Sequence, residues 1–167
     1  MCLTVDSIKM GIEGVGPISH RDALIANRPL IVRKRMVVDL GNHGRLVTPY
    51  QRLPMKLGVR YDDKKPFDIH GGFYDYSVKI DGGGFHAILS SATPDNCSWL
   101  RNTLPGEKLV YGIIPEGTRF FLGVNNDIVA KSIILYEKYR DLVAVHGQPV
   151  HRSKVRPVIH YTQRAPK

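Results

Sequence analysis

Long apolar runs are missing from this chain of 167 residues, and none approaches the roughly 20 residues that a membrane-spanning helix requires. The first ten residues, MCLTVDSIKM, also lack the basic start and apolar centre of a secretory signal. Both absences favour a protein that lies in the cytoplasm and has no membrane partner.

Cysteines are scarce, since Cys2 and Cys97 are the only two in the sequence. This number is too small for a disulfide scaffold, and the spacing fits no zinc-binding pattern. We therefore expect two free thiols in a reducing compartment and no metal site. The glycine-rich stretch at 81–86, DGGGFH, has neither GxGxxG nor GxxxxGK spacing, so we also expect no nucleotide cofactor.

Acidic residues are missing from the C-terminal end, because none follows Asp141, although five basic residues do. Five of the nine net positive charges therefore lie in residues 142–167. A second basic cluster, Arg33-Lys34-Arg35, interrupts the apolar run at 30–40. Concentrated positive charge attracts polyanions, and this attraction weakens as the salt concentration rises.

We predict from this charge pattern that basic residues bind an anionic partner, which is nucleic acid or a nucleotide. Tyr161 lies among the basic residues of the tail, where its ring could stack on a base. The same composition suits an arm that anchors the protein to a neighbouring subunit, or a solvated surface. The predicted nucleic-acid-binding residues are Arg33, Lys34, Arg35, Arg152, Lys154, Arg156, Tyr161 and Arg164.

The sequence also contains strong strand signals, above all in residues 109–135. Three apolar runs are separated there by turn residues at 115–117 and 123–126, a pattern that predicts three adjacent antiparallel strands. We expect Ile113, Phe121, Ile128 and Ile133 to lie in the core. In the N-terminal half, residues 30–40 and 45–48 flank a turn at 41–44 and predict a hairpin whose first strand is half exposed.

Helix signals are weak and few. Ser19 could cap a short helix that has Asp22 as its third residue, includes 23–26 and ends before Pro29, and Thr93 followed by proline predicts a second helix as far as about Arg101. Residues 49–68 contain three prolines and favour irregular structure. We therefore predict an α+β fold of mainly antiparallel strands with one or two short helices. Residues 1–142 would form a single domain, and residues 143–167 an extended basic tail.

Several short elements occur in a recognisable order, and together they cover most of residues 1–136 in patches. They are Met1-Cys2-Leu3, Thr48-Pro49-Tyr50, Gly84-Phe85-His86-Ala87, the segment IPEGTRFFLG at 114–123, and Asp127-Ile128-Val129-Ala130. This order resembles a family of small uncharacterised bacterial and phage proteins with MCL, TPY, GFHA and IPxGTxYxxG elements. The resemblance implies a fold and a phage or bacterial origin, with no activity to carry over. The chain departs from the family in its basic extension after residue 142 and its longer glycine-rich lead.

A second similarity concerns residues 107–121, which look like the late strand of ADP-ribosyltransferases. That similarity implies Glu107 as the catalytic acid and Arg33 or Arg35 as the early basic residue, with the sequence at 90–93 in place of the Ser-Thr-Ser element. Independently, Cys2 would become N-terminal if Met1 were removed, and a thiol beside an α-amine is a plausible nucleophile.

Taken together, these features favour a non-enzymatic phage or bacterial binding protein in the cytoplasm, which would be the host cytoplasm for a phage protein. Its basic residues would engage the anionic partner. One alternative is a virion-associated or other structural protein that the basic tail anchors to a neighbouring subunit. Another is a small enzyme that uses Cys2 or an ADP-ribosyltransferase-like site.

Overall fold

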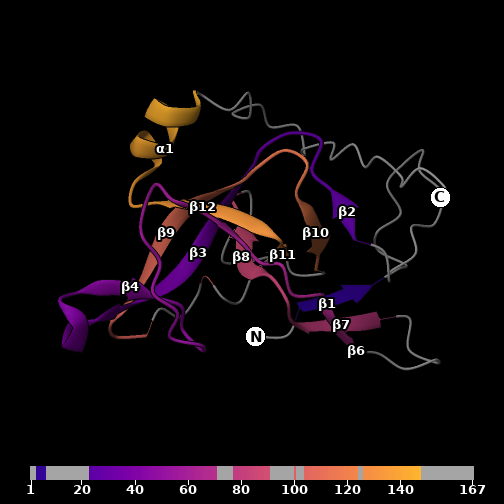
Figure 1. Ribbon diagram of the computed structural model, residues 1–167, viewed down its shortest axis with the longest axis horizontal. Helices are drawn as coiled ribbons and strands as arrows, with labels where there is room; N and C mark the ends of the chain where they lie inside the picture. Colours follow the sequence, from indigo (N-terminus) through magenta and orange to yellow (C-terminus); the bar gives the residue numbers. More distant parts are fainter. Residues whose placement is uncertain are drawn as a thin grey trace.

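The computed structural model of the protein describes residues 3–6, 23–70, 77–90, 100, 104–123 and 126–147 (Figure 1). Cys2, Cys97, the C-terminal residues after 147 and nearly all of the helix predicted from Thr93 lie outside these ranges. In chain order the described elements are β1 (Leu3–Asp6), β2 (Leu24–Ile25), β3 (Leu30–Asp39), the 3₁₀ helix η1 (Leu40–Asn42), β4 (Arg45–Val47), β5 (Arg60–Asp62), β6 (Asp68–His70), β7 (Ser77–Gly82), β8 (Phe85–Leu89), β9 (Glu107–Ile114), β10 (Arg119–Leu122), β11 (Asp127–Ala130), β12 (Ser132–Tyr136) and α1 (Tyr139–His146).

Antiparallel pairing joins the described strands into two sheets. The larger has nine strands, in the order β2-β10-β11-β8-β3-β9-β12-β5 with β4 added on β3, and the smaller has the order β1-β7-β6. The prediction of a mainly antiparallel β protein is confirmed, with one short α-helix in the described ranges. Within those ranges no helix has the length and apolar character needed to cross a membrane.

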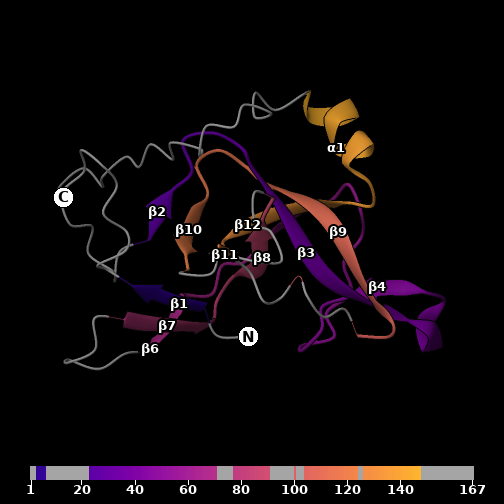
Figure 2. The ribbon, with the colours of Figure 1, turned by 180° about the vertical axis from the view of Figure 1, so that it is seen from behind.

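The larger sheet folds back on itself. At three places the chain leaves a strand in one part of the sheet and continues into a strand in another part. β2 continues into β3, β9 into β10 and β11 into β12, and the two members of each pair lie in different parts of the sheet (Figure 2). β3 pairs with β9 through Leu30 and Ile114, and β2 pairs with β10 through Leu24 and Phe120. The two chain segments therefore stay in the same register on both sides of the first bend. The sheet therefore supplies residues to its core from both sides.

The main core lies between the two parts of the bent sheet. Alternate residues of β3 point into it, since Val32 and Met36 are fully buried. The opposite parts contribute Phe120, Ile128 and Leu135, which are also fully buried. A second cluster of Ile80, Phe121 and Val129 attaches the smaller sheet to the larger one. The four predicted core residues Ile113, Phe121, Ile128 and Ile133 are all buried, which confirms that prediction.

The prediction of three adjacent strands over 109–135 is correct for one hairpin and wrong for the rest. β10 and β11 do pair, but β9 pairs with β3 and β12 instead of β10. The turn after β9 does not reverse the chain: Gly117 N donates to Ala26 O, and Ala26 N donates to Thr118 O. The chain can therefore run on beside β2, and the last apolar run divides at Lys131 into two strands on different parts of the sheet.

The predicted hairpin at 30–48 is confirmed by the pairing of β3 with β4. Asp39 Oδ1 accepts a hydrogen bond of 3.2 Å from Gly41 N, which helps to form the short turn between them. β3 is nevertheless more buried than predicted, because β8 and β9 flank it and every second residue from Leu30 to Met36 is buried.

Other local predictions fail where pairing or packing outweighs local preference. Leu24 and Ile25 form β2 instead of a helix, because they pair with Phe120 and Arg119. The stretch at 49–68 is largely irregular, as predicted, and the three-residue strand β5 is the main exception. The helix α1 was not predicted, and it continues past residue 142, where the tail was expected to begin. It packs on β9 and β12 through the fully buried Leu142 (Figure 1).

Candidate ligand pocket around Lys34

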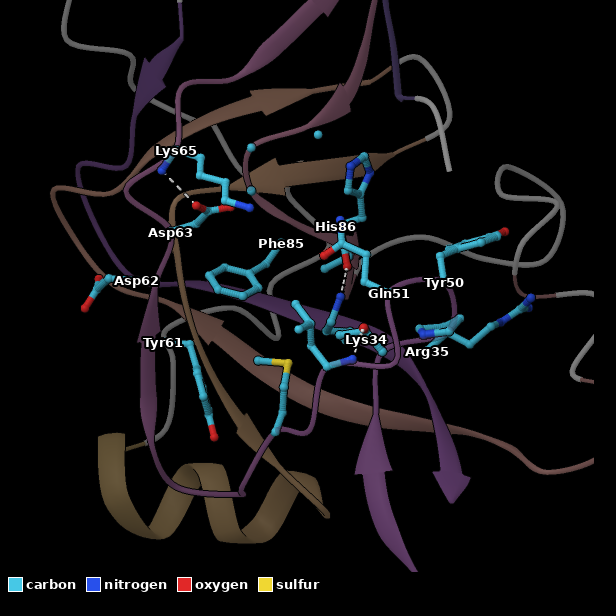
Figure 3. Close-up of a pocket in the computed structure, with 18 of the residues that line it drawn as sticks. Lys34, Arg35, Tyr50, Gln51, Tyr61, Asp62, Asp63, Lys65, Phe85 and His86 are labelled. Carbon is cyan, nitrogen blue, oxygen red and sulfur yellow. Dashed lines mark hydrogen bonds between the residues drawn. The ribbon is translucent and has the colours of Figure 1, made fainter. Parts of the chain in front are cut away.

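A pocket of about 410 Å³ lies beside Lys34 (Figure 3). Its walls come from β3, from β8 with the preceding glycines, and from the segments at 48–55 and 61–65. Apolar side chains make up much of the lining, including Met55, Phe85 and Ile88. A volume of this size is in the range of pockets that hold small organic ligands.

The segment at 48–55 forms one wall because it is folded tightly against β4. Thr48 N donates to Leu53 O at 2.9 Å, and Leu53 N donates back to Thr48 Oγ1 at 3.1 Å. Met55 N donates to Leu46 O at 2.9 Å, which fixes the end of the segment on the hairpin. The wall is therefore preformed, and its exposed aromatic ring, Tyr50, lies at the pocket (Figure 3).

The glycines at 82–84 let two backbone segments meet at another wall. Gly83 has a φ of +76°, and a Cβ on it would lie 1.8 Å from Pro66 O. A Cβ on Gly84 would lie 2.8 Å from a methyl group of Val129. The glycine run therefore serves close packing between the turn and residues 66–67, since a side chain at Gly83 would have no room.

Lys34 occupies a core-facing position on β3. Its neighbours on that face are Val32 and Met36, both fully buried, and only 5% of Lys34 is exposed. Its Nζ donates a hydrogen bond of 2.6 Å to the backbone oxygen of His86 (Figure 3). Burial lowers the pKa of Lys34 from its ordinary 10.5 to about 8.

No carboxylate compensates this buried amine within the described ranges, where the salt bridges involve other residues. The two aspartates at the pocket are engaged elsewhere. Asp62 accepts hydrogen bonds from Ser132 and from Arg60, and these interactions, with Ser132 first, hold its pKa below the ordinary value. Asp63 Oδ1 accepts a 2.9 Å hydrogen bond from Lys65 N (Figure 3).

Lys131 gives a useful contrast, because it also lies among backbone carbonyls. Its Nζ donates to the backbone oxygens of Lys65 and Gly83 and sits 3.9 Å from the centroid of the Phe67 ring. Burial, the largest effect, lowers its pKa, whereas Asp63 opposes this change. Lys131 lines a neighbouring pocket of about 350 Å³, but its cation already has partners on several sides. Lys34 has a single acceptor, which makes its pocket the stronger candidate site.

The predicted basic cluster on β3 is divided between two faces of the strand. Lys34 faces the core, and the alternation along β3 assigns Arg33 and Arg35 to the opposite face. Arg35 lies 3.4 Å from Glu107, and both side chains are 10% exposed. Arg35 nevertheless lines the pocket beside Lys34 (Figure 3). The three residues therefore do not form one continuous basic surface, although two of them border the same cavity. The other predicted binding residues, Arg152, Lys154, Arg156, Tyr161 and Arg164, lie outside the described residues.

Only some residues of the two enzymatic alternatives lie in the part of the chain that the structure describes. Glu107 begins β9, where its carboxylate pairs with Arg35 and accepts a 2.9 Å hydrogen bond from Leu104 N. Cys2 and the positions 91–93 lie outside the described residues. No group of three histidine, cysteine, aspartate or glutamate residues that could hold a metal occurs in the part of the chain that the structure describes.

Sequence reasoning selected Lys34 but missed most of the pocket around it. Tyr61, Asp63 and Phe85 come from segments far from β3 in sequence, and no local motif marks them. One available signal was the position of Lys34 between Val32 and Met36 on an otherwise apolar face. Another was the TPY and GFHA elements, because both border the pocket.

Comparisons with known protein families, with curated proteins and with solved structures find no match to this chain. The resemblance to the phage and bacterial family with the TPY and GFHA elements therefore stays a prediction.

Proposed function

We propose that the protein binds a small organic anion, no larger than a nucleotide, in the pocket beside Lys34. The buried amine of Lys34 carries this proposal, because it has one backbone acceptor and no carboxylate partner in the described ranges. A buried charge without a counterion is unfavourable, and an anionic ligand would supply the missing charge. This ligand is of the anionic class predicted from the sequence. The proposed contact, however, is a pocket and not a basic surface.

The lining favours an anion that carries a flat ring. Tyr61 and Phe85 approach edge to face with centroids 6.5 Å apart, and both border the pocket. Met55 adds a flexible apolar side chain to the same lining. Such surfaces bury a flat ring well, and the ammonium group of Lys34 would select for a ring that carries a phosphate or carboxylate.

Calorimetric titration with AMP and with pyridoxine 5′-phosphate tests this proposal, since each joins a planar ring to a phosphate. Lys34→Met should weaken binding by about 10- to 100-fold, which corresponds to a charge-assisted hydrogen bond of roughly 1.5–3 kcal/mol. Lys138→Met is the matched control, because Lys138 is an exposed lysine beside α1 and outside the pocket. Wild-type protein that binds neither compound, or Lys34→Met protein that binds both unchanged, would contradict the proposal.

We propose nucleic acid as a second anionic partner, bound through the C-terminal residues. The supporting observation is that five basic residues and no acidic residue follow Asp141 in the sequence. Deleting residues 148–167 should weaken binding to single-stranded DNA and flatten the dependence of log K on log salt, because fewer counterions are released. An unchanged salt slope would exclude this role. Dissociation of a larger assembly on deletion would instead favour the alternative of a subunit anchor.

A further inference from the structure

We propose that Lys34 forms an imine with an aldehyde or ketone group of the anion that the pocket takes. This inference rests on the proposed function for its ligand and adds a covalent step to it. The protein would then capture an anionic carbonyl compound reversibly, through a bond between its carbonyl carbon and Lys34 Nζ.

The first argument is the position of the amine. Lys34 extends from a central strand that β8 and β9 hold on both edges, so its backbone is fixed. Its Nζ reaches the backbone oxygen of His86 at 2.6 Å and borders a pocket of about 410 Å³. A neutral amine held by one N–H still has its lone pair to offer, and the adjoining pocket provides room for a carbonyl carbon.

The second argument is the fraction of amine that can react. A lysine must lose its proton before it can attack a carbonyl carbon, and desolvation in an apolar pocket is one way to make it lose that proton. With a pKa of about 8, roughly a tenth of Lys34 is neutral at pH 7. For a lysine at the ordinary 10.5, the neutral fraction is about 300-fold smaller. No carboxylate of the described residues pairs with Lys34 to hold the proton in place.

The reaction balances without any oxidant or reductant. The lone pair of Nζ forms the C–N bond while the carbonyl π electrons move to oxygen, and a proton passes from nitrogen to that oxygen. The resulting carbinolamine takes up one more proton on its hydroxyl group and loses water, which leaves a protonated C=N bond. The positive charge therefore stays at Nζ, where it continues to neutralise the anionic group of the ligand.

The third argument is the contrast with the other lysines of the region. Lys131 is held by two backbone oxygens and the face of Phe67, and Lys65 is an exposed side chain at the pocket. A reagent that selects for a desolvated amine beside a cavity should therefore prefer Lys34 over both. Selectivity among lysines is thus the measurable consequence of this geometry.

Pyridoxal 5′-phosphate is the probe, because it is an anionic aldehyde with a flat ring, and cyanoborohydride makes its imine permanent. The full chain would be treated at pH 7 with one equivalent of probe, and the adducts would be located by peptide mass spectrometry. We expect labelling of Lys34 at least about 10-fold faster than of any other lysine. Lys34→Arg keeps the charge and should abolish this adduct, while Lys138→Met should leave it unchanged.

Pyridoxine 5′-phosphate, which lacks the aldehyde, separates the imine from the binding of the anion. If this alcohol binds both wild type and Lys34→Arg but pyridoxal 5′-phosphate labels exposed lysines only, the imine proposal is overturned and the proposed function stands. If Lys34 is labelled selectively although the alcohol does not bind, the imine stands and simple anion binding fails. Labelling spread over many lysines in both proteins, without binding of the alcohol, would overturn both.

Discussion

The free energy of unfolding of the wild-type protein should gain a contribution of about 3 kcal/mol from Lys34 as the pH rises from 8 to 10.5. Burial lowers the pKa of this lysine in the folded state to about 8, whereas the unfolded chain keeps the ordinary 10.5. Between these values the unfolded state binds more protons than the folded state, so increasing pH favours folding. Below pH 8 both states are protonated, and the full cost of the buried charge remains.

Lys34→Met should remove this dependence, because methionine fills a similar volume and does not titrate. At pH 7 the variant should be more stable than the wild type by about the same 3 kcal/mol, since the buried ammonium is gone. Urea unfolding at a series of pH values measures both effects. Subtracting the curve of the variant from that of the wild type cancels the other titrating groups. Parallel curves would mean that Lys34 reaches water in the folded protein, while Lys138→Met should follow the wild type throughout.

The main strands were predictable because their signals are local. The apolar run at 30–40 and the turn after it identified the hairpin of β3 and β4, and the turn residues at 123–126 identified the hairpin of β10 and β11. A turn signal does not reveal whether the chain reverses, however. The residues between β9 and β10 bond to Ala26, about 90 positions earlier in the sequence, and the chain continues beside β2 instead. This partner could not be inferred from the turn itself.

The helix α1 was missed because its start carries no strong local signal. Lys138 occupies the N-cap position, and no side chain caps the first turn there. Packing of Leu142 against the group that includes Ile113 and Tyr136 supplies the stabilisation that capping does not. α1 therefore includes the first residues of the predicted tail, and its position depends on this tertiary contact.

Only the part of the site that lies on β3 could be predicted from the sequence. Strand alternation alone puts Lys34 on the same face as Val32 and Met36, and the structure has all three buried there. Its burial depends on His86, Met55 and Phe85, which reach β3 through separate pairings and turns. Because these contacts join segments that are 20 to 50 positions apart, the sequence showed a basic residue and not a pocket.

Phe121→Ala should destabilise the protein by about 3–5 kcal/mol, the usual cost of deleting a fully buried aromatic side chain. Only 1% of Phe121 is exposed, and its ring meets Phe67 edge to face with centroids 5.0 Å apart. It also shares a buried cluster with Ile80 of the smaller sheet and Val129 of the larger one. Its removal would leave a cavity where the two sheets meet.

Thermal melting measures this effect, with an expected fall in Tm of about 10 °C for a chain of this length. Tyr50→Ala is the matched control, because 64% of Tyr50 is exposed and its loss should change Tm little. A Phe121→Ala protein that melts within one or two degrees of the wild type would contradict the burial of this ring. A loss as large as predicted would take up a substantial part of the 5–15 kcal/mol that typically separates a folded domain from its unfolded chain. The packing of the two sheets around Phe121 would then be one of the larger single contributions to the stability of the fold.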